Sequence, residues 1–135
     1  MNVLFVCYAN SVRSQLAEAL ARKKFPEWNI MSAGARATAV HPAVFELVET
    51  LGGDPSQHYS KAVYEMDLDS IDVVVRLCAE PVIEKFPSHI REIVWELPDP
   101  GRAGVVASSE EEFISLLRER VNLLLQELSD EADTM

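Results

Sequence analysis

The apolar pattern at the start of the chain predicts a strand followed by a helix. Residues 3–6 (V-L-F-V) form a short apolar run that is long enough for a buried strand. Apolar residues then recur at spacing four, which predicts a helix from Ser11 or Val12 to Phe25, where Pro26 ends it.

The next stretch predicts a second strand and a second helix. Residues 28–33 suit a strand, which Gly34 closes. His41 and Pro42 open the helix, because proline is tolerated in the first turn and His41 is most simply the N-cap. An apolar stripe with helical spacing covers residues 44–51, and two glycines follow it.

The second half of the chain predicts two more strands and a long helix. Residues 71–77 (I-D-V-V-V-R-L) are β-branched and nearly continuous, as in a strand buried on both faces. Residues 92–95 predict the fourth strand, and residues 107–128 carry the apolar stripe of a helix. We expect the acidic tail, residues 130–135, to fray.

This order of elements is typical of an α/β fold, and 135 residues suit one domain over 1–135. Apolar residues make up 48% of the chain and charged residues 25%, as in ordinary soluble proteins. The net charge of −10 argues against nucleic acid or an anionic membrane as a partner. Because no signal peptide or membrane-spanning run is recognisable, we expect a cytoplasmic protein whose cysteines are reduced.

Cys7 and Arg13 flank the loop between the first strand and the first helix. A loop wrapped before a helix N-terminus points backbone N–H groups at one spot, where the helix dipole adds positive potential. That field favours the thiolate of Cys7, and Arg13 can hold an oxyanion with two parallel hydrogen bonds. The loop therefore predicts a nucleophile beside oxyanion donors, with a merely buried cysteine as the alternative.

Residues 7–14 read C-Y-A-N-S-V-R-S and resemble the C-x-x-x-x-x-R-S signature of the low-molecular-weight protein tyrosine phosphatase and arsenate reductase superfamily. The apolar strand before the motif and the A-E pair after it strengthen the resemblance, which spans nearly the whole chain. Tyr8 and Ala9 depart from the family, which usually has glycine in place of Ala9. The resemblance implies an oxyanion-binding loop made of Tyr8, Ala9, Asn10, Ser11, Val12 and Arg13.

The resemblance also implies a fold and supporting residues. The fold is a three-layer α/β structure, a four-stranded parallel open sheet in the order 2-1-3-4 with helices on both faces. Ser14 would hydrogen-bond the thiolate of Cys7, and Asn10 would hold the shape of the loop. Ser32, in the S-A-G at residues 32–34, would support the loop from outside.

The P-D-P at residues 98–100 stands where the family carries an Asp-Pro. By this resemblance Asp99 is the general acid that protonates the leaving oxygen. Glu96 is the nearby alternative acid, and an aspartate that only shapes a turn is the structural alternative.

Cys78 ends the third strand much as Cys7 ends the first. Because the carboxyl ends of parallel strands form the ligand edge of an open sheet, both cysteines face one crevice if their strands are neighbours. The V-V-R-L-C at residues 74–78 resembles the arsenate reductase branch, which carries a resolving cysteine there, whereas the phosphatase branch typically has none. A buried structural thiol is the alternative.

The resemblance thus implies an arsenate reductase that releases arsenite and forms a Cys7–Cys78 disulfide, with no cofactor and no metal. Residues 81–86 contain no third cysteine, so the three-cysteine thioredoxin relay of some relatives cannot operate in the same way. A thiol reductant such as glutathione with glutaredoxin, or thioredoxin, would have to reduce this disulfide directly. The alternatives are a phosphatase that forms a phosphocysteine, and a non-catalytic anion-binding or redox-sensing module.

Lys61 occupies a position where some arsenate reductases have an aspartate that helps to bind a potassium ion. Asn10 and Glu18 match two other ligands of that ion in those relatives. The resemblance suggests that the Lys61 ammonium replaces the ion and holds Asn10 and Glu18 in place. A solvated surface lysine is the alternative.

Overall fold

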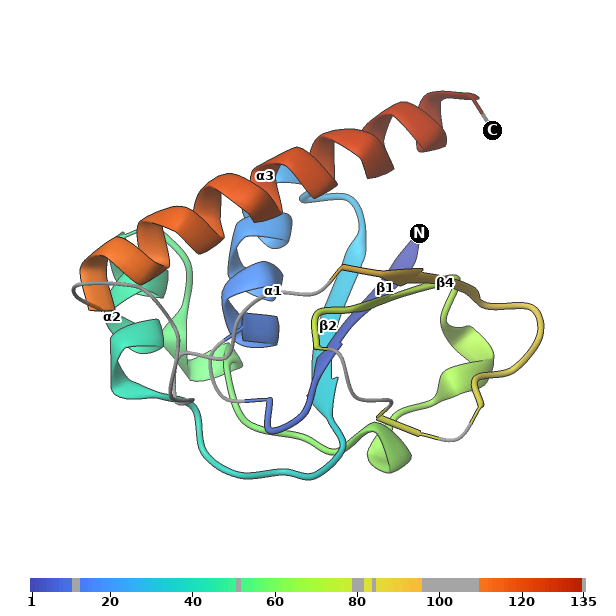
Figure 1. Cartoon of the computed structure of the whole chain (residues 1–135), viewed down its shortest axis with the longest axis horizontal. Coiled ribbons are helices and arrows are strands. Elements are labelled where there is room, and N and C mark those ends of the chain that lie inside the picture. The colour runs from blue at the N-terminus through green and yellow to red at the C-terminus, as the bar shows by residue number, and fades with distance from the viewer. Residues whose placement is uncertain (11–12, 51, 79–81, 84, 96–109, 135) are drawn as a thin grey trace.

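The sheet has four parallel strands in the order β2-β1-β3-β4, as the sequence predicts (Figure 1). The computed structural model describes residues 1–10, 13–50, 52–78, 82–83, 85–95 and 110–134. The strands are β1 (Asn2–Cys7), β2 (Asn29–Gly34), β3 (Val73–Arg76) and β4 (Arg91–Val94). The expected α/β fold is therefore confirmed, and the carboxyl ends of β1 and β3 lie next to each other.

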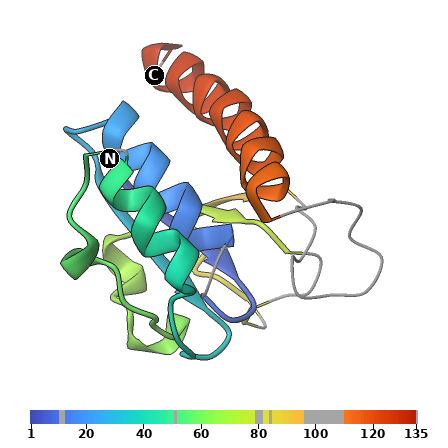
Figure 2. The ribbon, with the colours of Figure 1, turned by 90° about the vertical axis from the view of Figure 1, so that its left-hand side faces the viewer.

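In the described residues, three α-helices and three short 3₁₀ helices connect and cover the strands. The α-helices are α1 (Arg13–Lys24), α2 (Pro42–Thr50) and α3 (Glu110–Thr134). The 3₁₀ helices are η1 (Pro55–Gln57), η2 (Val63–Glu65) and η3 (Leu68–Ser70). Helix α1 lies between α2 and α3 (Figure 2). No helix in the described part of the chain is long and apolar enough to cross a membrane.

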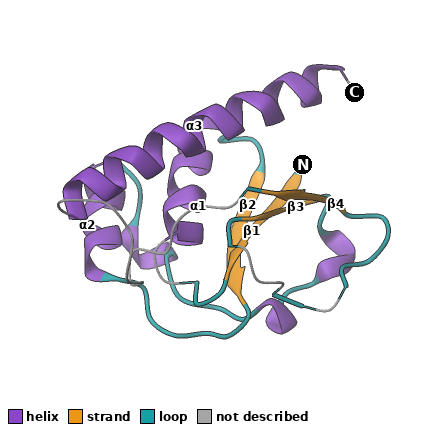
Figure 3. Ribbon diagram, in the orientation of Figure 1, coloured by secondary structure: helices purple, strands orange, loops and turns teal. Residues whose placement is uncertain are grey.

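Two apolar cores cover the two faces of the sheet, because successive residues of a strand point to opposite sides. Val3, Phe5, Val73 and Val75 pack against apolar residues of α1 and α3. The opposite face is covered by η2, η3 and residues beyond β3 (Figure 3). We call this second cluster the η-side core; it contains Leu4, Val6, Cys7, Ala33, Val63, Ile71, Val74, Cys78, Val82, Phe86 and Ile90.

The elements differ from the prediction mainly at their ends. Strand β3 is shorter than predicted because Ile71 ends η3, although the Leu77 N–H still donates to the Val6 carbonyl at 2.8 Å. The predicted fraying is wrong for residues 130–134, since α3 continues to Thr134; Met135 lies outside the described residues. No proline or glycine interrupts that segment, and Asp130 accepts a hydrogen bond from Gln126 one turn earlier at 3.1 Å.

Candidate active site

Cys7 ends β1, and α1 begins at Arg13 on the other side of the loop. Both side chains are nearly buried, with 2% of Cys7 and 7% of Arg13 exposed. The sulfur of Cys7 lies 2.9 Å from Ser14 Oγ. Because Ser14 Oγ accepts a hydrogen bond from the Asn10 amide, its proton is available to the sulfur. The Ser14 hydroxyl can therefore stabilise a thiolate at Cys7, which is the role that the family resemblance implies for it.

Asn10 gives the loop its shape. Its backbone is left-handed, with φ of 51°, a conformation that asparagine tolerates better than most residues. The buried side-chain amide makes four hydrogen bonds, which use both donors and both lone pairs of its oxygen. It donates to Ser14 Oγ (2.8 Å) and Ser32 Oγ (3.0 Å), and accepts from Gln15 Nε2 (3.0 Å) and the Lys61 N–H (2.8 Å).

Gly34 is the last residue of β2 and pairs in register with Cys7 of β1. Its lack of a side chain lets the loop lie directly against β2. A Cβ atom at position 34 would lie 2.8 Å from both the Asn10 nitrogen and the Tyr8 carbonyl oxygen. Such distances are too short for carbon against backbone atoms, so this position requires glycine. The close packing explains the S-A-G that the sequence places beside the loop.

Behind the loop lies a buried polar cluster, of which the sequence predicted Glu18 but neither Gln15 nor His58. Gln15 Nε2 donates to Asn10 Oδ1 and to the carbonyl oxygen of Tyr59, each at 3.0 Å. His58 Nδ1 lies 3.0 Å from Gln15 Oε1 and 3.1 Å from Glu18 Oε2. Glu18 Oε1 accepts the Ser32 hydroxyl at 3.0 Å. The cluster thus connects the loop to the segment after η1.

His58 and Glu18 do not form an ion pair at neutral pH, although their side chains are close. Burial, and then the charges of Arg22 and Lys61, lower the pKa of His58 to about 4. Burial also raises the pKa of Glu18, against the opposing effect of Arg22 and Lys61. A neutral His58 that carries its proton on Nδ1 can donate towards the acceptors on Gln15 and Glu18.

We expect His58→Gln to reduce the acid sensitivity of folding. Since the pKa of His58 falls from an ordinary 6.5 to about 4 in the folded protein, the unfolded chain binds more protons between these values. His58 thus opposes folding as the pH falls from 6.5 to 4, by about 1 kcal/mol per pH unit. Urea unfolding at several pH values should show that the free energy of unfolding decreases less steeply with falling pH in His58→Gln than in the parent. Equal slopes of this free energy against pH in the two proteins would contradict the prediction.

Lys61 is 8% exposed, so it is not a solvated surface lysine. Its backbone N–H donates to the side-chain oxygen of Asn10. Its ammonium donates to the carbonyl oxygen of Tyr59 at 2.8 Å and lies 4.1 Å from the centre of the Tyr59 ring. The ammonium acts on Glu18 through charge. Within the described residues, no group of three or more His, Cys, Asp or Glu side chains is arranged to hold a metal ion.

Cys78 lies close to the loop. In the pairing of β1 with β3, Val6 stands opposite Arg76, so Cys7 and Cys78 continue from the ends of neighbouring strands. Both cysteines are buried in the η-side core, and neither is in a disulfide. The remaining predicted site residues, Ser11, Val12, Asp99 and Glu96, lie outside the described residues.

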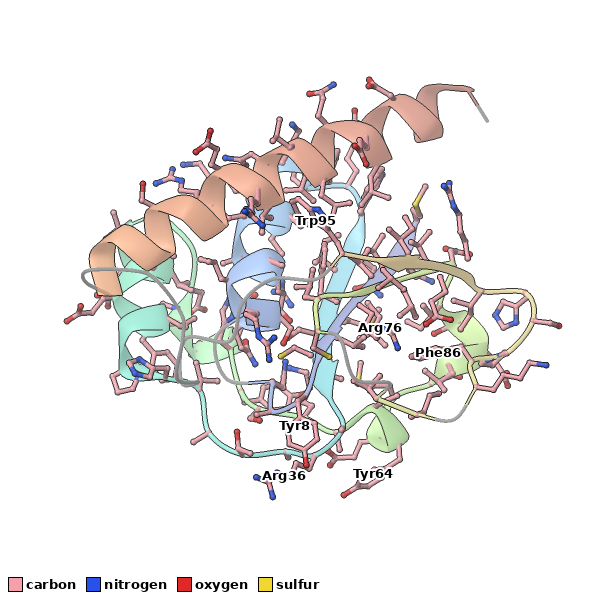
Figure 4. The ribbon with its side chains drawn as sticks, viewed as in Figure 1. Tyr8, Arg36, Tyr64, Arg76, Phe86 and Trp95 are labelled. Carbon is pink, nitrogen blue, oxygen red and sulfur yellow. The ribbon has the colours of Figure 1, made fainter. Side chains whose placement is uncertain are left out.

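The residue that follows Cys7 in the loop is an exposed aromatic residue. Tyr8, 43% exposed, has the Arg36 guanidinium 5.5 Å from its ring centre, and Figure 4 shows the two side chains next to each other. Taken together, Cys7, Arg13 and Cys78 provide a thiol nucleophile, an arginine and a nearby second thiol. Such a set can form a covalent adduct with a tetrahedral oxyanion, and can also supply two electrons by forming a disulfide.

Comparison with known proteins places the chain in a family and finds relatives with a named activity. Residues 2–134 match the family described as low molecular weight phosphotyrosine protein phosphatase. An arsenate reductase of Brevibacillus brevis is 35% identical over 101 residues, which cover 73% of this chain and 75% of that protein.

Two solved structures have the same fold. The thioredoxin-dependent arsenate reductase of Corynebacterium glutamicum has a TM-score of 0.72 and 25% identity, covering 96% of this chain and 62% of that chain. The low molecular weight protein tyrosine phosphatase from T. tengcongensis has a TM-score of 0.76 and 24% identity, covering 97% and 99% of the two chains. The second likeness concerns the fold alone.

Proposed function

Because this chain belongs to the low molecular weight phosphotyrosine protein phosphatase family, we propose that it is an arsenate reductase that uses Cys7 and Cys78. The position of the two thiols carries this proposal, since they follow neighbouring strands and share the η-side core. Hydrolysis of a phosphate ester ends with water and has no need of a second thiol. The relatives named as arsenate reductases support the same reading.

In the first step, the Cys7 thiolate attacks the arsenic atom of arsenate. The Ser14 hydroxyl stabilises the thiolate until it attacks, while Arg13 and the loop amides hold the remaining oxygens. An As–S bond forms and an As–O bond breaks. Asp99 gives the departing oxygen a proton, so that it leaves as water; this role rests on the sequence resemblance.

In the second step, the thiolate of Cys78 attacks the sulfur of Cys7. An S–S bond forms, the S–As bond breaks, and its electron pair stays on arsenic, which leaves as arsenite. The two cysteines are oxidised by two electrons and the arsenic is reduced by two. Arsenate is itself the oxidant, and no reductant other than these two thiols is consumed until the disulfide is reduced again.

An external thiol reductant restores the two cysteines. The chain has two cysteines in all, so the Cys7–Cys78 disulfide must itself react with that thiol. Glutathione with glutaredoxin is our first choice and thioredoxin the second, although the related enzyme of Corynebacterium glutamicum is thioredoxin-dependent.

A free-thiol count tests the proposed function. We expect fully reduced protein to lose both of its thiols when it is mixed with arsenate without a reductant, and to release one arsenite per chain. The same count with phosphate is the control and should leave both thiols intact. If both thiols also survive arsenate, the chain is not a reductase of this type.

The family and the loop also support a protein tyrosine phosphatase as the second candidate function. In that reaction Cys7 forms a phosphocysteine, which water hydrolyses with Asp99 as the base. A loop that holds tetrahedral oxyanions accepts both phosphate and arsenate. The role of Cys78 therefore separates the two functions.

We further expect activity to be independent of potassium, with Lys61 in place of the ion. The Lys61 N–H already holds Asn10, and its buried ammonium supplies positive charge near Glu18. Replacing potassium by tetramethylammonium at constant ionic strength should change kcat/KM by less than about twofold, a difference of under 0.5 kcal/mol. Sodium is the matched control, and activity that rises with potassium alone would refute the replacement.

A further inference from the structure

The carbonyl oxygens of two residues in the oxyanion-binding loop are bonded to segments outside the loop. The Tyr8 oxygen accepts a hydrogen bond from the Arg36 N–H at 3.4 Å. The Ala9 oxygen accepts two hydroxyl groups, from Thr38 Oγ1 at 2.8 Å and from Ser60 Oγ at 3.3 Å, which occupy both of its lone pairs. Both carbonyl groups therefore point away from the centre of the loop.

The two hydroxyl groups come from separate segments that are bonded to each other. Thr38 lies between β2 and α2, in residues 35–41, which form neither helix nor strand. Ser60 lies in the segment after η1. The Thr38 N–H donates to Ser60 Oγ at 2.8 Å, so the single proton of that hydroxyl is left for the Ala9 oxygen. Every donor of this small network thus has an acceptor, and the network ends on the loop.

The direction of a carbonyl group fixes the direction of the N–H that follows it. The described peptide bonds are trans, and the N–H of a planar trans peptide points opposite to its C=O. Because the Ala9 carbonyl points out of the loop, the Asn10 N–H points into it, and the Tyr8 carbonyl orients the Ala9 N–H in the same way. If the peptide between Ala9 and Asn10 turned over, a carbonyl oxygen would replace a donor and repel an oxyanion.

We propose that Thr38 and Ser60 are positioning residues of the oxyanion-binding loop. Their hydroxyl groups keep the peptide between Ala9 and Asn10 in the orientation that directs its N–H at the bound oxyanion. The inference deepens the proposed function and rests on it, because that function requires the loop to bind arsenate. In this role neither hydroxyl touches a reacting atom, so the expected effect is on the binding of the oxyanion.

The first experiment measures the binding of inorganic phosphate to fully reduced protein by calorimetry, without any turnover. Thr38→Val keeps the shape of the side chain and removes its hydroxyl, and Thr38→Val combined with Ser60→Ala removes both donors. We expect the Kd for phosphate to rise about threefold in the single variant and about tenfold in the double variant, as one and then two hydrogen bonds are lost. Thr38→Ser keeps a hydroxyl and should restore the parental affinity.

Thr50 provides the matched control. It is an exposed threonine at the end of α2, and its hydroxyl donates to the Glu46 carbonyl oxygen at 2.9 Å. Thr50→Val therefore removes a comparable hydrogen bond outside the loop and should leave the affinity for phosphate unchanged. A parental Kd in the Thr38 and Ser60 variants, or an equal loss of affinity in Thr50→Val, overturns the inference. If the double variant does not fold, Thr38→Val and Thr38→Ser decide alone.

The second experiment separates the orientation of the peptide from a general loss of stability. The backbone N–H signals of Ala9 and Asn10 are followed by NMR while phosphate is added, and both should move downfield in the parent as they bond to the anion. We expect a smaller movement of the Asn10 signal at saturation in Thr38→Val, and recovery in Thr38→Ser. A merely structural Thr38 would lower the temperature of unfolding and leave this movement unchanged, which overturns the inference even if phosphate binds more weakly.

The same measurements distinguish failure of the inference from failure of the proposed function. If the parent binds phosphate and the variants behave as expected while arsenate leaves both thiols intact, the proposed reductase fails and the positioning role stands. If arsenate oxidises both thiols and the variants bind phosphate as the parent does, the role of Thr38 and Ser60 alone is overturned. A parent that binds no phosphate would overturn both.

Discussion

Replacing Cys78 by serine is expected to lower arsenate turnover by roughly three orders of magnitude. A serine cannot attack the Cys7 sulfur to form a disulfide, so the arsenic adduct has no route to arsenite inside the protein. Hydrolysis of an aryl phosphate, which needs the loop but no second thiol, should stay within a few fold of the parent. Steady-state assays of both reactions on the same preparation measure this separation.

Cys7→Ser is the matched control, because it removes the nucleophile that both reactions share. It should lose arsenate reduction and aryl phosphate hydrolysis together. Arsenate turnover that persists in Cys78→Ser would mean that the second thiol comes from outside the chain. Cys78 would then be part of the packing of the η-side core.

Gly34→Ala is expected to damage the loop as strongly as the loss of a catalytic group. The added methyl group would lie 2.8 Å from backbone atoms of Tyr8 and Asn10, which cannot rotate away as a side chain can. Forcing the loop away from β2 should cost about 1–3 kcal/mol of stability. It should also lower kcat/KM on the order of a hundredfold, because the oxyanion donors would be misplaced.

Gly52→Ala is the control for the change from glycine to alanine. Gly52 has φ of 82° and nothing within 4 Å of an added Cβ, so this variant should lose about 1 kcal/mol of stability and keep its activity. Thermal unfolding and phosphate binding by calorimetry should be measured for both variants. If Gly34→Ala binds phosphate as the parent does, the loop does not depend on its close contact with β2.

Much of the fold could be predicted from the sequence because the apolar pattern is strong where the sheet is buried. Residues 3–6 and 73–75 are continuous apolar runs, and they form the two central strands. The ends of elements were harder to predict, since α3 continues through an acidic segment that carries no apolar stripe. The strand order came from the resemblance to the family, because apolar periodicity does not say which strands pair.

The site residues that belong to the short sequence motif could be predicted. Cys7, Arg13 and Ser14 lie within eight residues of one another, so their spacing in sequence was informative. Gln15 and His58 were missed because 43 residues separate them, and neither forms part of a short pattern. A glutamine in a helix and a histidine in a polar stretch usually have no special role, and only the folded chain joins them.

The four hydrogen bonds of the Asn10 amide limit which amino acids position 10 can accept. Aspartate would keep the acceptors for Gln15 and Lys61 and lose the donors to Ser14 and Ser32. Glycine would keep the left-handed backbone and lose all four bonds, and glutamine is one carbon too long for the same partners. In a library that varies this codon, asparagine alone meets the backbone and side-chain demands together, so the position has almost no mutational tolerance.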